Sequence, residues 1–246
     1  AGNQGDDADI RKSLAVWDLA RARVEPYVQT FESCIAAGDV LPDFDVATET
    51  INRYETAKRL DDRRDFADVL AEYAGLSFTT HGITETASTA SPPGNIRLVC
   101  VDEAQDSSAL VDRVCRHVAS GENVEHVRLY GDPFQACHGF AGASAGNFLS
   151  WPAATQEVMP RSFRCPSDIL DVGEECIAGV EGYFDRKILP APHDGEIIYA
   201  NSPDEAIESI DFREETLILA RCNFTLNKYR RALRDKEIPF REIDDD

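Results

Sequence analysis

The sequence predicts an α/β protein with a helical N-terminal segment. Two observations carry this prediction. Apolar residues recur at helix-like spacings up to about residue 76, and from residue 95 onward short apolar runs alternate with amphipathic stretches. Alternating strands and helices are typical of βαβ units, in which the strands are parallel. We therefore expect helices first and a parallel sheet after them.

The first 94 residues are expected to form a helical segment followed by a linker. The apolar side chains that recur with helical spacing include Ile10, Leu14, Trp17, Val28, Phe31 and Ile35. Residues 77–94 are instead rich in Thr, Ser, Gly and Pro, a composition typical of loops. We interpret that stretch as the linker.

The next segment is a short apolar run, residues 96–101 (IRLVCV), that ends abruptly in residues 102–106 (DEAQD). A run with a single charge predicts a strand covered on both faces of a parallel sheet. Ligands bind beyond the carboxyl ends of such strands, where an Asp can hold Mg²⁺ against nucleotide phosphates. The alternative is that the acidic residues only cap the helix that begins after Ser107 and Ser108.

Further strands and helices are expected beyond that helix. A second apolar strand, residues 127–130, leads directly into residues 131–143 (GDPFQACHGFAGA), and residues 161–169 (RSFRCPSDI) follow. The remaining pattern predicts helices at 167–178, 203–210 and 224–236 and strands at 196–200 and 216–220.

Taken in order, these segments resemble motifs of the UvrD/Rep-like superfamily 1 DNA helicases. Residues 102–106 resemble the family's Walker B motif, residues 131–143 its GDxxQxIYxFRGA motif, and residues 161–169 its NYRS motif. Residues 217–223 (LILARCN) resemble the LxRTN strand of the second motor domain. Residues 65–70 (DFADVL) resemble the DFDDLL element upstream of Walker B.

The resemblance implies RecA-like parallel-sheet lobes of the P-loop NTPase type. Residues 1–94 would correspond to a helical insertion and linker. Residues 95–157 would be the C-terminal part of the first RecA-like domain, and residues 158–246 the N-terminal part of the second.

The resemblance also implies roles at a site for ATP and Mg²⁺. Asp102 would coordinate Mg²⁺ and Glu103 would activate the attacking water. Gln135 would sense the γ-phosphate and couple it to DNA, and Arg164 would reach the phosphates from the second lobe. The remaining nucleotide-site residues implied by the motifs are Gln105, Asp106 and Arg221.

Single-stranded DNA is the expected partner of the loop at residues 131–143. His138 and Phe140 take the places of the family's stacking aromatics, and stacking one base contributes about 1–3 kcal/mol. Ala141 replaces the family's usual Arg, so one cationic contact is missing. The alternative for Phe140 is a core residue packed on the sheet.

The expected function is that of a fragment of an ATP-dependent DNA helicase that moves along single-stranded DNA, in DNA repair or replication. No G-x-x-x-x-G-K-[ST] phosphate-binding loop occurs in the sequence, so the isolated chain is expected to hydrolyse ATP poorly. The alternative is a catalytically inactive, helicase-like binding or scaffolding module.

Charge and cysteine usage limit these expectations. The net charge of −20 opposes binding to a phosphate backbone, although a composition with 20 Arg and only 5 Lys is also typical of proteins that work at high salt. The 7 cysteines include no C-x-x-C pair, which predicts buried free thiols in a reducing cytoplasm and no zinc or iron–sulfur site. No apolar run approaches the ~20 residues of a membrane span.

Overall fold

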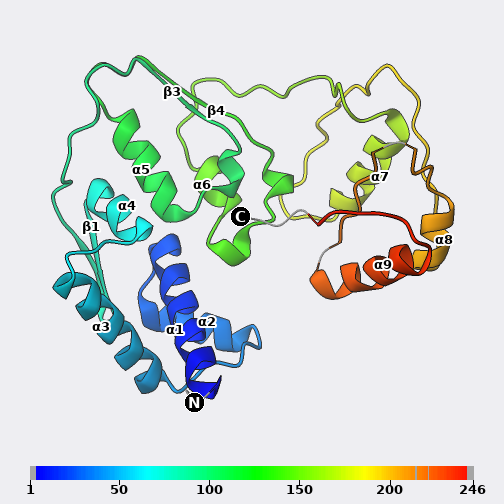
Figure 1. Ribbon diagram of the computed structural model, residues 1–246. Coiled ribbons are helices and arrows are strands. Elements are labelled where there is room, and N and C mark those ends of the chain that lie inside the picture. The colour runs from blue at the N-terminus through cyan, green and yellow to red at the C-terminus, as the bar shows by residue number, and fades with distance from the viewer. Residues whose placement is uncertain (1–3, 214, 221, 243–246) are drawn as a thin grey trace. The chain divides into compact units, whose positions relative to one another are not determined.

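The computed structural model describes residues 4–213, 215–220 and 222–242, and the chain divides into two compact units, residues 1–156 and 157–246 (Figure 1). Within the described residues, the first unit holds helices α1 to α6 and strands β1 to β4, and the second holds α7 to α9. Within the described part of the chain, no helix is long and apolar enough to cross a membrane.

The first unit begins with four helices, as the sequence predicts. They are α1 (Gln4–Arg23), α2 (Tyr27–Ala36), α3 (Phe44–Leu60) and α4 (Phe66–Ala74). Their apolar core is aromatic at its centre, where the rings of Trp17 and Tyr27 meet edge to face with centroids 6.1 Å apart. The other buried members of this core are Val16, Ala20, Phe31, Cys34, Ala47 and Ile51.

Helix α4 begins at a complete capping box. Asp65 accepts a hydrogen bond from the backbone N–H of Asp68, and the Asp68 side chain accepts one from the backbone N–H of Asp65. This reciprocal arrangement satisfies two N–H groups that a helix start would otherwise leave unpaired. The DFADVL segment therefore has a structural role in positioning α4.

The same two carboxylates belong to a partly buried ionic cluster. Arg21, 2% exposed, donates to Asp65 at 2.9 Å and to Asp68 at 3.1 Å. Lys58 donates to Asp65 at 2.8 Å, to Asp68 at 2.7 Å and lies 3.0 Å from Glu55.

The contacts of Asp65 lower the pKa of its carboxyl group. Burial would raise this pKa, but the hydrogen bonds from Lys58 and from the Asp68 N–H, together with the Arg21 charge, hold it well below its usual range. The cluster joins α1, α3 and α4.

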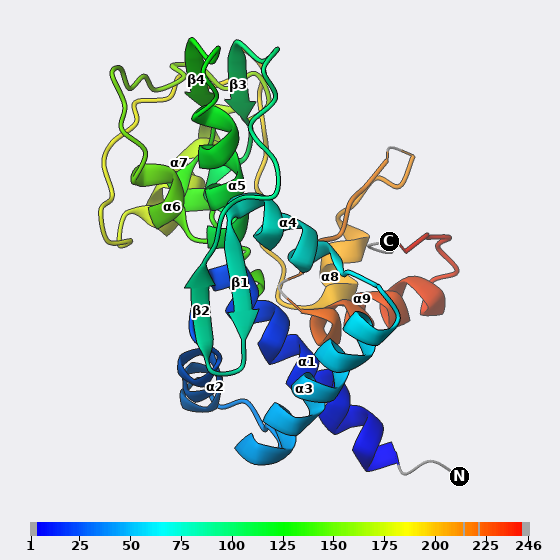
Figure 2. The same cartoon turned by 90° about the vertical axis from the view of Figure 1, so that its left-hand side faces the viewer.

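The stretch expected to be a linker instead contains a β-hairpin. Strands β1 (Leu76–Thr79) and β2 (Gly82–Glu85) pair in antiparallel register (Figure 2). The loop prediction was wrong here because alternating side chains bury one face. Leu76 is buried, while Phe78 and Ile83 pack against the helical core. Thr and Ile are also favoured in strands.

The parallel pairing expected after residue 95 is confirmed for two strands. Strand β3 (Leu98–Val101) pairs with β4 (His126–Leu129), and α5 (Ala109–Ala119) lies between them in sequence. Burial on both faces was a wrong prediction, since Leu98 is 48% and Val127 37% exposed. Among the described residues this sheet has two strands, which leaves part of its apolar surface open.

The second unit contains the three expected helices, α7 (Ser167–Ile177), α8 (Pro203–Glu208) and α9 (Asn223–Asp235). Ile207, Ala232 and Leu233 form its small core. The strands predicted at 196–200 and 216–220 are absent from the described residues of this unit. Strands need neighbours to pair their backbone groups, and the sole pairing described here is an isolated bridge between Arg161 and Leu189.

Most cysteines are not buried as expected. Cys34 is buried, whereas Cys100, Cys137, Cys176 and Cys222 are exposed. The apolar runs around them predicted burial, but β3 and the loops that carry several of them are open to solvent. An exposed thiol is available for metal binding or oxidation.

Candidate functional site

The polar residues that follow β3 and β4 lie at the same edge of the parallel pair. Tyr130 donates its backbone N–H to the Val101 carbonyl at 2.8 Å, and Ala104 donates to the Tyr130 carbonyl at 2.9 Å. These bonds extend the strand pairing by one step on each side. They bring the DEAQD segment against the start of the GDPFQ segment.

Glu103 has an unusual backbone conformation at this edge. Its φ of 48° and ψ of 42° are left-handed, which costs a non-glycine residue on the order of 1–3 kcal/mol. The 3-10 helix η1 (Ala104–Asp106) begins immediately afterwards. Strained backbone of this kind concentrates at functional sites, and Glu103 is exposed to solvent.

Gln105 is the buried centre of the site, only 1% exposed. Its Nε2 donates to a carboxylate oxygen of Glu103 at 2.8 Å and to Asp106 at 3.2 Å. Its Oε1 accepts the backbone N–H of Asp132 at 3.1 Å. One amide side chain therefore ties the acidic end of β3 to the loop after β4.

The loop after β4 continues this connection. Asp132 caps the 3-10 helix η2 (Pro133–Gln135) by accepting the Phe134 N–H at 3.0 Å, and its second oxygen accepts from Gln135 Nε2 at 2.8 Å. A hydrogen-bonded connection thus runs from Glu103 through Gln105 and Asp132 to Gln135. Sequence reasoning did not single out Asp132, although an Asp followed by Pro at the first helical position is a recognisable cap signal.

Gly131 permits the close approach of the two segments. A Cβ at this position would lie 2.4 Å from Gln105 Oε1 and 3.2 Å from the Ala104 nitrogen. Because both atoms are held by hydrogen bonds, neither can move without breaking one. A side chain at Gly131 is therefore incompatible with this arrangement.

We expect Gly131→Ala to lower the free energy of unfolding by about 1–3 kcal/mol, as overpacking of a well-packed site typically does. Urea denaturation of the purified chain measures the change. Gly139→Ala is the matched control, because a Cβ there meets nothing within 4 Å. Equal stability of the two variants would contradict the close packing of Gln105 against Gly131.

The two residues expected to bind DNA lie together on the same loop. The rings of His138 and Phe140 have centroids 5.7 Å apart and are tilted by 49°. Phe140 is 78% exposed, which rules out the alternative of a core residue. Gly142 follows Phe140 in this loop and has a φ of 87°. A Cβ on Gly142 would lie 2.8 Å from the Cβ of Ala22 in α1.

The other candidate residues differ in their surroundings. Asp102 is exposed and accepts the backbone N–H of Glu103 at 3.1 Å. In Asp106 one carboxylate oxygen, Oδ1, is buried without a hydrogen-bond partner.

Arg164 belongs to the second unit. Its side chain is exposed, and its backbone N–H donates to the Ser162 hydroxyl at 3.2 Å. Arg221 lies outside the described residues.

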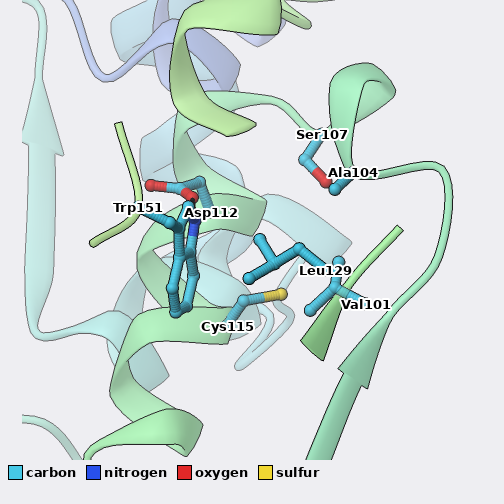
Figure 3. Close-up of a pocket in the computed structure, with 7 residues that line it drawn as sticks. All are labelled: Val101, Ala104, Ser107, Asp112, Cys115, Leu129 and Trp151. Atoms are coloured by element: carbon cyan, nitrogen blue, oxygen red, sulfur yellow. Dashed lines mark hydrogen bonds between the residues drawn. The ribbon is translucent and has the colours of Figure 1, made fainter. Parts of the chain in front are cut away.

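A narrow apolar pocket lies behind the site, between the strand pair and α5 (Figure 3). Trp151 closes it, donating its indole N–H to Asp112 at 2.6 Å while the Arg116 guanidinium lies 4.4 Å from its ring centroid. Arg116 also donates to Asp112 at 2.7 Å. The residues that line the pocket are Val101, Ala104, Ser107, Asp112, Cys115, Leu129 and Trp151. Their packing supports η1 and the ends of both strands.

Fold and site together define a helix-rich α/β protein with its polar residues gathered at one end of a parallel strand pair. The family model of the UvrD/REP helicase N-terminal domain matches residues 32–155, just over half of the 246 residues. The chain therefore belongs to the UvrD/REP helicase family, which confirms the resemblance seen in the motifs. The match lies entirely within the first unit. No curated protein matches the chain.

Proposed function

We propose that this chain is part of an ATP-dependent DNA helicase that couples ATP hydrolysis to movement along single-stranded DNA. The observation that carries the proposal is the connection from Glu103 through Gln105 and Asp132 to Gln135 in a chain of this family. It links the expected general base to the loop that bears the expected DNA contacts. A motor needs a physical link of this kind.

The acidic end of β3 suits a hydrated Mg²⁺ ion. Asp102 and Glu103 are exposed carboxylates, and carboxylate oxygens are the ligands that Mg²⁺ prefers. In this proposal Asp102 is the metal ligand, and the bound ion would neutralise charge on the nucleotide phosphates. Glu103 takes the proton of the attacking water, and Gln105 holds one of its oxygens in place by donating to it.

The second unit carries the two cations that we propose for the nucleotide phosphates, Arg164 and Arg221. We assign residues 95–157 and 158–246 to parts of two RecA-like lobes. The family match and the polar strand ends support the first assignment. The NYRS-like and LxRTN-like motifs support the second. A cation placed on a transferring phosphoryl group can accelerate the reaction about 10³-fold or more.

His138 and Phe140 form the proposed platform for single-stranded DNA. Two exposed rings on one loop, with centroids 5.7 Å apart, can stack on bases without regard to their sequence. We expect Phe140→Ala to weaken binding of a fluorescent oligothymidine, measured by anisotropy, by about 5- to 150-fold. This follows from the loss of about 1–3 kcal/mol of stacking free energy.

Phe66→Ala is the matched control for Phe140→Ala. Phe66 is 77% exposed, close to the 78% of Phe140, but it begins α4 and lies outside the loop. Its replacement is expected to leave the DNA affinity unchanged. Equal loss in both variants would show that the loop is not the DNA contact.

A non-catalytic binding module is the second candidate function. The observations that favour it are His138 and Ala141 at positions where the family carries stronger DNA contacts, together with the net charge of −20. DNA-stimulated ATPase activity of the protein that the complete gene encodes separates the two functions. Activity that depends on Glu103 supports the motor.

A further inference from the structure

We infer that Asp106, Cys137 and His138 form a binding site for a divalent transition metal, of which Zn²⁺ fits best. A carboxylate oxygen, a thiol sulfur and an imidazole nitrogen from these residues lie within 4.8 Å of one another. Asp106 ends η1, and Cys137 and His138 belong to the loop after η2. Asp106 is distant in sequence from the adjacent Cys137 and His138, so ligand spacing along the chain does not reveal the site.

The donor atoms identify the class of metal. Thiolate and imidazole favour Zn²⁺ and related borderline ions over Mg²⁺ or Ca²⁺, which prefer oxygen. Tetrahedral zinc with bonds of 2.0–2.3 Å holds its ligand atoms about 3.3–3.8 Å apart. Because no two of these atoms are more than 4.8 Å apart, the closure needed is at most about 1.5 Å, which rotation of the exposed Cys137 and His138 side chains can provide.

A second observation also points to a cation here. Asp106 Oδ1 is buried without a hydrogen-bond partner, and the other oxygen accepts only the long 3.2 Å bond from Gln105 among the bonds described. A carboxylate oxygen removed from water without a partner is costly. A metal ion bound to Asp106 would offset that cost, and Cys137 would release its thiol proton to water on binding.

The other carboxylate group with metal-like spacing does not support a site. Glu55, Asp65 and Asp68 also converge within 4.8 Å. There, however, the Lys58 ammonium already contacts all three carboxylates at 2.7–3.0 Å. Within the described residues, the group around Asp106 has no such cation.

A metal at Asp106 would join η1, next to Glu103, to the loop that carries Phe140. The ion would hold the His138 ring against Asp106 and so compete with its stacking on DNA. Metal occupancy would then regulate the affinity for single-stranded DNA, a consequence that rests on the proposed function. The metal site itself does not depend on that function.

Titration of the metal-free purified chain with Co²⁺ tests the site directly. We expect thiolate-to-cobalt charge-transfer absorption that saturates at one ion per chain and disappears when Zn²⁺ is added. Cys137→Ser should abolish this band. Cys176→Ser, the matched exposed cysteine on α7, should retain it. Absence of the band in the wild type, or its persistence in Cys137→Ser, would overturn the site.

His138→Gln and Asp106→Asn test the other two ligands. Loss of an outer-shell partner already weakens metal affinity about 10- to 100-fold, so loss of a ligand should weaken Co²⁺ binding at least as much. Unchanged affinity in both variants would contradict the assignment.

Oligothymidine binding with and without Zn²⁺ tests the regulatory consequence separately. Weaker DNA binding with Zn²⁺ in the wild type, but not in Cys137→Ser, supports it. Equal binding with and without Zn²⁺ would refute the regulation. A chain that binds no DNA would contradict the proposed function while leaving the cobalt result in place.

Discussion

Asp65→Asn is expected to lower the free energy of unfolding of the first unit by about 3 kcal/mol. The substitution keeps the shape of the side chain but removes the charge that Arg21 and Lys58 share. Breaking a buried ion pair from one side typically costs about 3–5 kcal/mol. We take the lower end, because the Asp65 side chain is 22% exposed and Asp68 still contacts both cations. Urea denaturation followed by circular dichroism measures the effect.

The surface pair of Arg53 and Glu49 provides the control. Both side chains are well exposed, at 78% and 61%, and exposed pairs contribute about 0–1 kcal/mol. Glu49→Gln should therefore have little effect. A similar loss of unfolding free energy in both variants would show that the partly buried cluster around Asp65 stabilises the fold no more than an exposed ion pair does.

The pH dependence of stability gives an independent test of the Asp65 prediction. The folded-state pKa of Asp65 lies below its unfolded value, so its contribution is fully present above an ordinary Asp pKa of about 3.9. It is lost as the pH falls from there toward the folded-state pKa. The wild type should lose more stability than Asp65→Asn over that window. Parallel pH curves would contradict the low pKa.

The sequence was most successful in predicting local features, which are determined by residues next to one another in the chain. The end of β3 just before Asp102 follows from a short run of adjacent residues. The meeting of the DEAQD and GDPFQ segments follows from one further rule, that parallel strands end at the same edge of a sheet. That rule sufficed to bring Glu103 and Gln135 to one site.

Contacts between distant side chains could not be predicted in the same way. Arg21 and Asp65 are 44 residues apart, and nothing in their local sequence pairs them. The partly buried hydrogen bond from the Asp132 N–H to Gln105 depends on the absence of a side chain at Gly131. The wrong strand predictions at 196–200 and 216–220 have a related cause, because an apolar run forms a strand only where another strand pairs with it.

Glu103→Gln is expected to lower DNA-stimulated ATP hydrolysis of the protein that the complete gene encodes by about 10²- to 10⁴-fold, the usual contribution of a general base. Gln has the same shape and its carbonyl oxygen can still accept the hydrogen bond from Gln105. Nucleotide binding should therefore persist, as measured with a fluorescent ATP analogue in Mg²⁺. Glu122→Gln, on the exposed turn before β4, is the matched control.

Stability measurements separate catalysis from folding in the Glu103→Gln variant. The left-handed backbone at Glu103 is equally unfavourable for Gln, so the strain stays in place and the free energy of unfolding should change by less than about 0.5 kcal/mol. Loss of turnover without loss of stability would identify Glu103 as the base. Normal turnover in the variant would refute that role. A wild type that hydrolyses no ATP with single-stranded DNA would instead favour the binding module, because an intact link from Glu103 to Gln135 has no motor function without hydrolysis.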